Sequence, residues 1–212
     1  MRKFFRFALA LIILGIIGII AEFLYHLPSH SFNAFRYYTL YGGGERCIKK
    51  LEEQTNDFVS LGTFEKGHCR VKNAVRISSF NNTELSGDLT LSCPTAVKVG
   101  KYLNEINAKY IEHMGTYNCR TIANSKVMSE HSYGTAIDIS KIDGASVKHD
   151  WNKKNEKGNI LSNAYEVACG YFSNVLTPDT DRAHQDHFHF DNGYGRKCFW
   201  GLLLEEKCKV KD

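Results

Sequence analysis

Proline is scarce in this sequence, with three residues among 212. Proline-rich stalks are therefore excluded, because such segments need proline at short intervals to stay extended. Internal repeats and low-complexity tracts are also absent from the sequence, which excludes a repeat architecture. No basic stripe with interleaved aromatic residues occurs, and the formal net charge is only +4, so nucleic acid is not an expected partner.

The sequence also lacks a Cys-x-x-Cys pair, which disfavours a zinc site built from cysteines. Its seven cysteines are instead scattered: Cys47, Cys69, Cys93, Cys119, Cys169, Cys198 and Cys208. Disulfide bonds in an oxidising compartment explain such a distribution better. Up to three bridges can form, and the sequence alone does not fix which cysteines pair.

The N-terminus carries a long apolar run, from Phe7 to Ala21, behind the basic residues Arg2, Lys3 and Arg6. A membrane-spanning helix needs about 20 predominantly apolar residues, and the residues after Ala21 bring the run close to that length. Basic residues before the run favour a cytoplasmic N-terminus. We therefore expect residues 1–25 to form an uncleaved anchor. A cleaved signal peptide is the alternative, although the bulky residues after the run disfavour a cleavage site.

Beyond the anchor, we expect a linker at residues 26–46, a single domain at residues 47–200 and a charged tail at residues 201–212. The linker contains a triple glycine, which is typical of a flexible joint. The domain has a normal size for one fold with its own hydrophobic core.

Apolar spacing predicts helices at residues 47–58, 93–115 and 160–176, and a strand at residues 72–80. The second helix would open at Pro94 and close at Gly115. The third carries an apolar stripe that we expect in the core: Leu161, Ala164, Ala168, Phe172 and Val175.

Histidines gather near the C-terminus, in the stretch "RAHQDHFHFDNG" from Arg182 to Gly193. In a strand, residues two apart share a face. His187, His189 and Asp191 would then point one way, while the phenylalanines between them point into a core. The stretch is either a polar surface loop, which is the simpler interpretation, or a metal or catalytic site.

A second cluster lies in "SEHSYGTAIDIS", Ser129 to Ser140, where His131 and Asp138 flank Gly134. The alternation around Asp138 predicts a short strand with buried neighbours. One histidine and one aspartate from here, with one histidine from the later stretch, make three zinc ligands and leave a fourth position open, as in catalytic zinc sites. Alternatively, His131 is a core histidine and Asp138 a turn or capping residue.

This stretch fits the Ser-x-His-x-x-Gly-x-Ala-x-Asp motif and so resembles the zinc peptidases that include D-alanyl-D-alanine carboxypeptidases, a murein endopeptidase and the hedgehog domain. More narrowly, the chain resembles the bacterial extensin-like proteins. The shared segments are "YNCR", "ACGYF", "VLTPD", "HQDHFH" and a late cysteine, between Cys47 and Cys198. The mixture of helices and short strands predicts an α+β domain with a central, mainly antiparallel sheet packed by helices, in which the strands bearing Asp138 and His189 pair. This arrangement is consistent with the resemblance.

The resemblance also assigns roles to individual residues. His131, Asp138 and His189 match the ligands of a Zn²⁺ ion. His187 matches a histidine that lies beside the water activated by the metal, and we expect it to act as the base. The family pattern leaves Cys208 outside, so we expect this cysteine to be the unpaired one.

Further catalytic candidates are His184 and Asp186, which would orient His187 or share its work. The carboxypeptidases have glutamate where this chain has Asp186, so either the shorter carboxylate reaches the water or His187 takes that role. Arg120 is the candidate for substrate binding. A bridge at Cys119 would brace the segment that leads to the site.

The function implied is a zinc-dependent peptidase or amidase that hydrolyses peptide bonds in the stem peptides or cross-links of cell-wall peptidoglycan. The alternative is a catalytically inactive, zinc-stabilised binding module of the cell envelope. The domain would lie in the periplasm, attached to the inner membrane, or would be secreted if the N-terminal segment is cleaved. The polar insert at residues 143–159 is expected to be a solvated loop or a substrate-contacting rim with Trp151 as a stacking surface.

Overall fold

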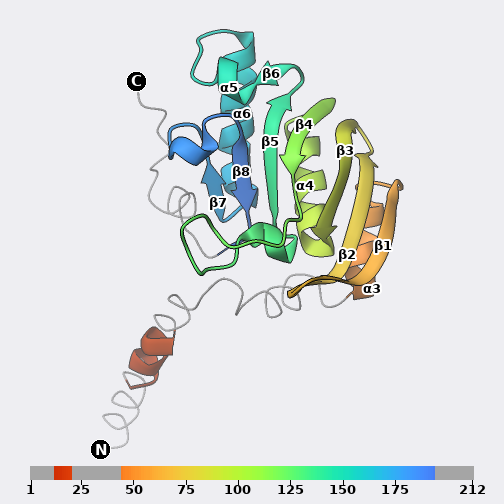
Figure 1. Cartoon of the computed structure of the whole chain (residues 1–212), viewed down its shortest axis with the longest axis vertical. Coiled ribbons are helices and arrows are strands. Elements are labelled where there is room, and N and C mark those ends of the chain that lie inside the picture. The colour runs from red at the N-terminus through yellow and green to blue at the C-terminus, as the bar shows by residue number, and fades with distance from the viewer. Residues whose placement is uncertain (1–11, 21–43, 194–212) are drawn as a thin grey trace, which may run out of the picture.

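An eight-stranded mixed sheet runs through residues 44–193 of the computed structural model, which describes these residues and residues 12–20 (Figure 1). The strands are β1 (Phe58–Lys66), β2 (Cys69–Phe80), β3 (Thr83–Ser92), β4 (Tyr110–Gly115), β5 (Ala136–Ile142), β6 (Ala145–Ser146), β7 (Asn174–Leu176) and β8 (Phe188–Asp191). Their order is β1-β2-β3-β4-β5-β8-β7, and β6 pairs with β5. The pair β3–β4 is parallel, and the other pairs are antiparallel.

Helices pack on one face of this sheet. They are α3 (Gly44–Glu52), α4 (Cys93–Glu105), α5 (Val147–Asp150) and α6 (Glu156–Tyr171), with 3-10 turns η1 (Glu130–Tyr133) and η2 (Arg182–His184). α4 contacts β2 and β3, α6 contacts β6 and β7, and α4 also contacts α3 and α6. Figure 1 shows α4 and α6 behind the strands. The opposite face is therefore available to the side chains that point away from the core.

The predicted α+β class is confirmed, as a single domain with a mixed sheet. β5 and β8 pair antiparallel, with Asp138 directly opposite His189. Phe188 and Phe190 are fully buried, and Phe190 packs edge-on against Tyr102 of α4 at 5.5 Å between ring centroids. Because side chains alternate along a strand, Asp138 and His189 lie on the face opposite the helices.

The helix predicted at residues 93–115 is wrong in its second half. α4 ends at Glu105, and Asn107 then adopts a left-handed backbone conformation with φ 54°. The following residues form β4, which pairs with β3 and β5 and buries Ile111 completely. Strand pairing on both sides therefore overrides the helical spacing.

The first and third predicted helices extend too far at their C-terminal ends. α3 ends at Glu52, and Phe58 opens β1, because Thr55 forms a turn by accepting a hydrogen bond from the backbone N–H of Asp57 (2.9 Å). α6 ends at Tyr171, so Val175 of the predicted stripe lies in β7. All five residues of that stripe are nevertheless buried, as predicted. The strand predicted at residues 72–80 is confirmed within β2.

The described residues contain no helix long and apolar enough to cross a membrane. Residues 12–20, inside the predicted anchor, are helical and exposed. The other residues of that anchor and the whole tail at 201–212 lie outside the described part of the chain.

Two disulfide bonds join described cysteines, Cys47–Cys93 and Cys69–Cys119. The first links α3 to the start of α4, and the second links β2 to the segment after β4. Cys169 is disulfide-bonded as well. Cys198 and Cys208 lie outside the described residues, so the expectation of an unpaired Cys208 stays a prediction.

Candidate metal centre

Three predicted ligands come together at one point of the molecule: His131 of η1, Asp138 of β5 and His189 of β8. Nε2 of His131 lies 3.2 Å from Nδ1 of His189 and 3.1 Å from Oδ2 of Asp138. Nδ1 of His189 lies 2.8 Å from Oδ1 of Asp138. We call these residues the His-Asp-His cluster. Two imidazole nitrogens and a carboxylate form a donor set that suits zinc.

Local sequence explains how η1 carries His131 to the sheet. Ser129 caps the turn by accepting from the backbone N–H of His131, and Gly134 ends it with a left-handed φ of 64°. A Cβ on Gly134 would lie 2.8 Å from the backbone nitrogen of Ser92, which donates to the carbonyl of Gly134. Glycine is required here, because both the conformation and the close approach exclude a side chain.

The hydrogen bonds around the cluster fix where its lone pairs point. Nδ1 of His131 donates to the carbonyl oxygen of Thr116, and Nε2 of His189 donates to Oδ2 of Asp191 (2.9 Å). A neutral imidazole has one N–H, so Nε2 of His131 and Nδ1 of His189 keep lone pairs that face each other and the Asp138 carboxylate. Three such acceptors repel one another unless a cation or a proton lies among them. The cluster therefore fits a metal ion.

Without a metal, a second proton on His189 relieves the repulsion between these acceptors. Burial alone would lower the pKa of His189, but hydrogen bonds to Asp138 and Asp191 outweigh burial and raise this pKa to about 9. Burial would likewise raise the pKa of Asp138, but the hydrogen bonds and charges of both histidines hold it well below its usual range. A zinc ion would replace this proton as the central positive charge.

His187 lies beside the cluster with its ring oriented by a carboxylate. Its Nδ1 donates to Oδ1 of Asp186 over 2.7 Å, and its Nε2 lies 3.7 Å from Oδ1 of Asp138. The bond from His187 lowers the pKa of Asp186, which keeps this carboxyl ionised at neutral pH. Asp186 therefore contacts His187, and the lone pair on Nε2 of His187 is directed toward the cluster.

His184 has a carboxylate partner of its own. Its Nδ1 donates to Oδ1 of Asp181 over 2.7 Å, and its ring centroid lies 5.2 Å from that of His187 and 5.5 Å from that of His189. Burial lowers the pKa of His184, and Asp181 opposes this only in part. His184 is therefore a neutral imidazole at pH 7.

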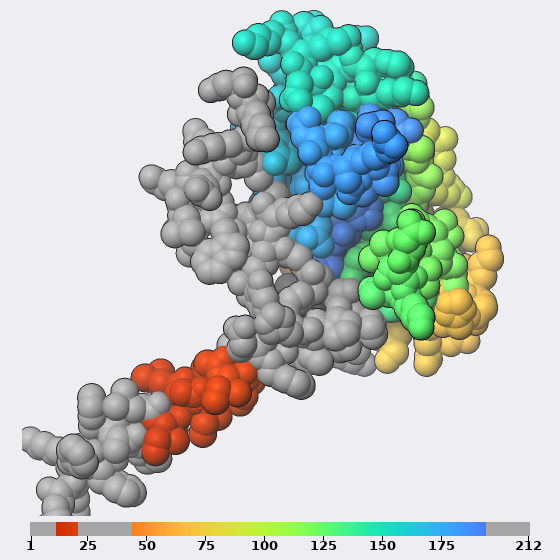
Figure 2. All heavy atoms as spheres, turned by 60° about the vertical axis from the view of Figure 1, so that its left-hand side comes forward, coloured from red at the N-terminus to blue at the C-terminus, as the bar shows by residue number. Residues whose placement is uncertain are grey.

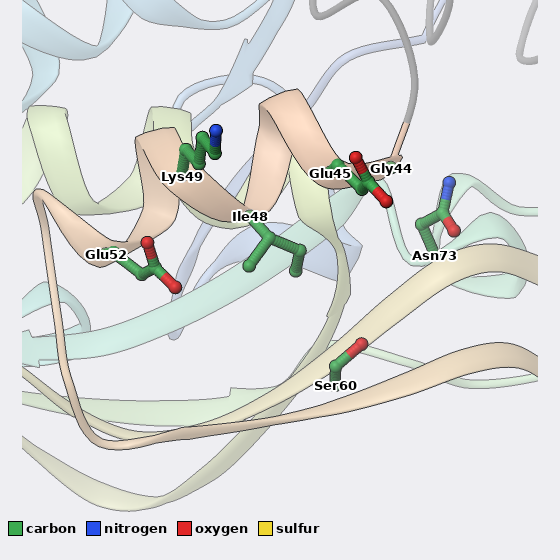
Figure 3. Close-up of a pocket in the computed structure, with 7 residues that line it drawn as sticks. All are labelled: Gly44, Glu45, Ile48, Lys49, Glu52, Ser60 and Asn73. Carbon is green, nitrogen blue, oxygen red and sulfur yellow. The ribbon is translucent and has the colours of Figure 1, made fainter.

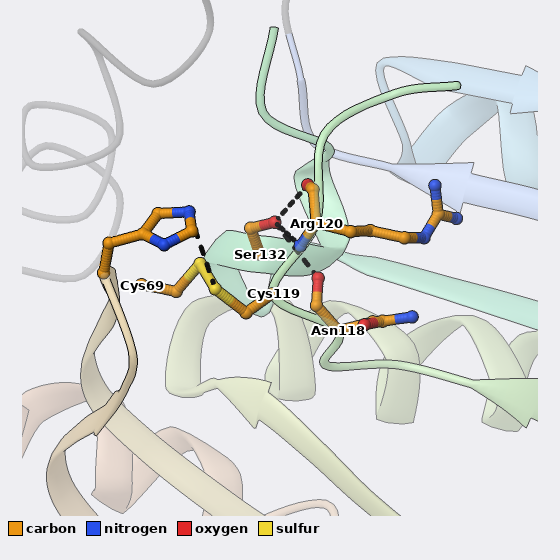
Figure 4. The surroundings of a disulfide bond; sticks show 6 residues. Cys69, Asn118, Cys119, Arg120 and Ser132 are labelled. Atoms are coloured by element: carbon orange, nitrogen blue, oxygen red, sulfur yellow. Dashed lines mark hydrogen bonds between the residues drawn. A yellow bond between two sulfur atoms is a disulfide. The ribbon is translucent and has the colours of Figure 1, made fainter. Parts of the chain in front are cut away.

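Arg120 belongs to a segment that is attached to η1. Its backbone N–H donates to Oγ of Ser132 (3.0 Å), and this hydroxyl also contacts the carbonyl oxygens of Asn118 and Arg120. Figure 4 shows these bonds beside the Cys69–Cys119 disulfide, with the Arg120 side chain pointing away from the bridge. The predicted bridge at Cys119 is thus present, and it braces the residues that precede His131.

Segments 181–187 and 117–129 both lie on the side that Figure 2 brings forward, where they appear in blue and green. The Trp151 ring is half-buried and packs edge-on against Phe188 (5.1 Å) and Tyr165 (5.7 Å), and its use as a stacking surface for substrate stays a prediction. Its indole N–H donates to Asp179 (2.8 Å). Within the insert at residues 143–159, Ala145 and Val147 are buried in the core, whereas residues 152–157 are exposed, as expected for a solvated loop.

Two other features of the described residues do not belong to this centre. A pocket of about 460 Å³ between α3 and the first two strands is lined by Gly44, Glu45, Ile48, Lys49, Glu52, Ser60 and Asn73 (Figure 3). His68 lies close to Cys69 and Cys119, but these cysteines are joined in a disulfide and offer no thiolate for a metal.

Some partners in the centre are not evident from the sequence. Asp181 is one of them, because its role depends on the 3-10 turn that brings it to His184. The spacing in the sequence does place Asp191 on the same face as His189, which is a usable signal for their hydrogen bond. The contact from Thr116 is made by a backbone oxygen, which no side-chain motif reveals.

The fold and the cluster define an α+β domain that presents two histidines and an aspartate on the sheet face opposite its helices. Residues 45–198 match the family model of the extensin-like protein C-terminus. The matched part includes the whole cluster, and the chain belongs to this family. Neither a curated protein nor a solved structure matches the chain.

Proposed function

We propose that this protein is a zinc-dependent peptidase or amidase that acts on the stem peptides or cross-links of cell-wall peptidoglycan. The observation that carries the proposal is the meeting of three lone-pair donors, His131 Nε2, His189 Nδ1 and the Asp138 carboxylate, with the base candidate His187 beside them. Three protein ligands leave a fourth position for water or substrate. The choice of substrate comes from the motif shared with the zinc peptidases and is an analogy.

When bound in such a site, zinc makes water a nucleophile near neutral pH and polarises the carbonyl that is attacked. His187 accepts the proton of the attacking water at Nε2, because Nδ1 is already engaged with Asp186. Asp186 stabilises the resulting imidazolium. His187 then returns the proton to the leaving amine, so one residue serves as base and acid.

Two further residues act on substrate in this proposal. Among the described residues, the Arg120 guanidinium contacts only the carbonyl oxygen of Thr121 (3.4 Å), which leaves it available for a substrate carboxylate. His184 is neutral, so it aids through position and hydrogen bonding rather than as a cation. The domain would work outside the cytoplasm, in the periplasm or as a secreted protein, as its disulfides favour.

The test is zinc-dependent release of fragments from purified peptidoglycan. The full-length protein should release soluble peptide or amino acid products, chelation should stop release, and added zinc should restore it. His187→Ala serves as the matched control, because it keeps the ligands. Zinc binding without any release from peptidoglycan would instead support the binding-module alternative.

A further inference from the structure

His189 is held by two carboxylates, one at each ring nitrogen. Nδ1 faces Asp138 at 2.8 Å, and Nε2 donates to Oδ2 of Asp191 at 2.9 Å. Asp138 has a place in the proposed donor set, whereas Asp191 lies on the far side of the ring. Asp191 therefore has no direct access to a metal bound by Nδ1 of His189.

Asp191 is itself locked in place. Only 5% of this residue is exposed, and its Oδ1 accepts hydrogen bonds from Nδ2 of Asn174 (2.8 Å) and from the backbone N–H of Gly193. On the sheet, β8 sets Asp191 between Ala136 of β5 and Asn174 of β7. A buried carboxylate whose two oxygens both accept hydrogen bonds has a fixed position. It therefore also fixes the orientation of the imidazole that it contacts.

We infer that Asp191 is a positioning residue that sets the metal affinity of the His-Asp-His cluster, an inference that rests on the proposed function. Its carboxylate selects the His189 tautomer with the lone pair on Nδ1, orients the ring and makes that nitrogen a stronger donor. Such partners of metal-bound histidines typically account for about 10-fold to 100-fold in metal affinity.

The two histidines of the cluster differ in how they are supported. His131 is oriented by the backbone carbonyl of Thr116, which no side-chain substitution removes. His189 is oriented by a side chain, so its support is open to substitution. Asp191 is therefore the residue through which the donor strength of the cluster is adjusted.

The test measures the zinc dissociation constant of the full-length protein by competition with a chromophoric chelator. Asp191→Asn keeps the shape of the side chain and should weaken zinc binding by about 10-fold to 100-fold. Asn174→Ala, which leaves the carboxylate but frees one oxygen, should give a smaller loss. Asp186→Asn is the matched control, because its carboxylate contacts His187 and not a ligand, and it should bind zinc like the wild type.

Absorption spectra of the Co²⁺ form add a second measurement, because they depend on the metal ligands and not on the overall stability of the fold. The bands of the Co²⁺ form should shift in Asp191→Asn and stay unchanged in Asp186→Asn. Wild-type zinc affinity and an unchanged spectrum in Asp191→Asn would overturn the inference and leave the proposed function standing. A wild type that binds no zinc would overturn both.

Discussion

At the scale of single residues, hydrogen bonds decide which ring nitrogen of each histidine is engaged and which one faces the centre. Thr116 and Asp191 occupy one nitrogen of His131 and His189, so the remaining nitrogens converge on Asp138. Asp186 does the same for His187, so Nε2 of that histidine faces the cluster, 3.7 Å from Oδ1 of Asp138. This geometry separates the two proposed ligands, His131 and His189, from the proposed base, His187.

His131→Ala should lose zinc, whereas His187→Ala should keep zinc and lose activity. The first change removes a donor nitrogen, and the second removes a proton acceptor that typically contributes about 10²-fold to 10⁴-fold in rate. Metal content by elemental analysis and product release from peptidoglycan measure the two effects on the same preparations. Loss of zinc in His187→Ala would refute the division between ligands and catalyst.

At the scale of elements, η1 depends on the segment that the Cys69–Cys119 bridge holds. Ser132 of η1 is bonded to the backbone of Asn118 and Arg120, the two neighbours of Cys119. The bridge therefore acts on the element that carries His131, and not only on the stability of the whole domain.

The double variant Cys69→Ser/Cys119→Ser should lose about 2–4 kcal/mol of unfolding free energy and bind zinc more weakly. Cys47→Ser/Cys93→Ser is a matched control, because its bridge has a similar sequence separation, 46 against 50, but holds α3. Ser92, next to Cys93, is also held by its pairing with Ala74 of β2, so we expect its position to persist in this control. Urea unfolding and zinc titration of both variants are the measurements, and equal zinc affinity in the two would contradict the coupling.

The elements most open to prediction were those with one dominant signal. β2 and the buried stripe from Leu161 to Val175 follow from apolar spacing, and the pairing of the strands with Asp138 and His189 follows from the pattern of helices and strands, with which the motif resemblance agrees. β4 was missed because its residues also fit a helical period, and only pairing with β3 and β5 decides between the two. Local spacing carries no information about such distant partners.

At the scale of the whole molecule, the charges in the candidate metal centre make the stability of the fold depend on pH. Charged His189 stabilises the metal-free fold, because its folded pKa of about 9 lies above the ordinary value of 6.5. This contribution is complete below pH 6.5 and is lost as the pH rises through about 9. Asp138 has a depressed folded pKa, so its contribution is present above its ordinary pKa of 3.8 and is lost as the pH falls toward the depressed value.

The melting temperature of the metal-free protein should therefore fall between pH 6.5 and pH 9. The zinc-loaded protein should not show this fall, because the metal replaces the proton. Metal-free His189→Gln is the control, since it lacks the titrating ring and should be less pH-dependent over the same interval. Calorimetry of the three samples tests this, and identical profiles for metal-free wild type and His189→Gln would contradict it.

The molecule as a whole was predictable in its class and in the members of its centre, but not in how they are connected. Motif resemblance supplied His131, Asp138, His189 and His187, and the structure brings them together. The role of Asp186 was left open in the sequence, since only the fold shows that it turns toward His187. The partner of a side chain depends on the backbone geometry of two segments. A motif describes the spacing within only one of these segments.

The most direct test of this account is the zinc content of the full-length protein, measured by elemental analysis for wild type and His189→Ala. We expect about one zinc per wild-type chain and its loss in the variant, because His189 supplies one of the three ligands in the proposed site. The account would be contradicted if wild-type protein prepared in the presence of zinc contained no zinc. It would also be contradicted if His189→Ala retained the zinc.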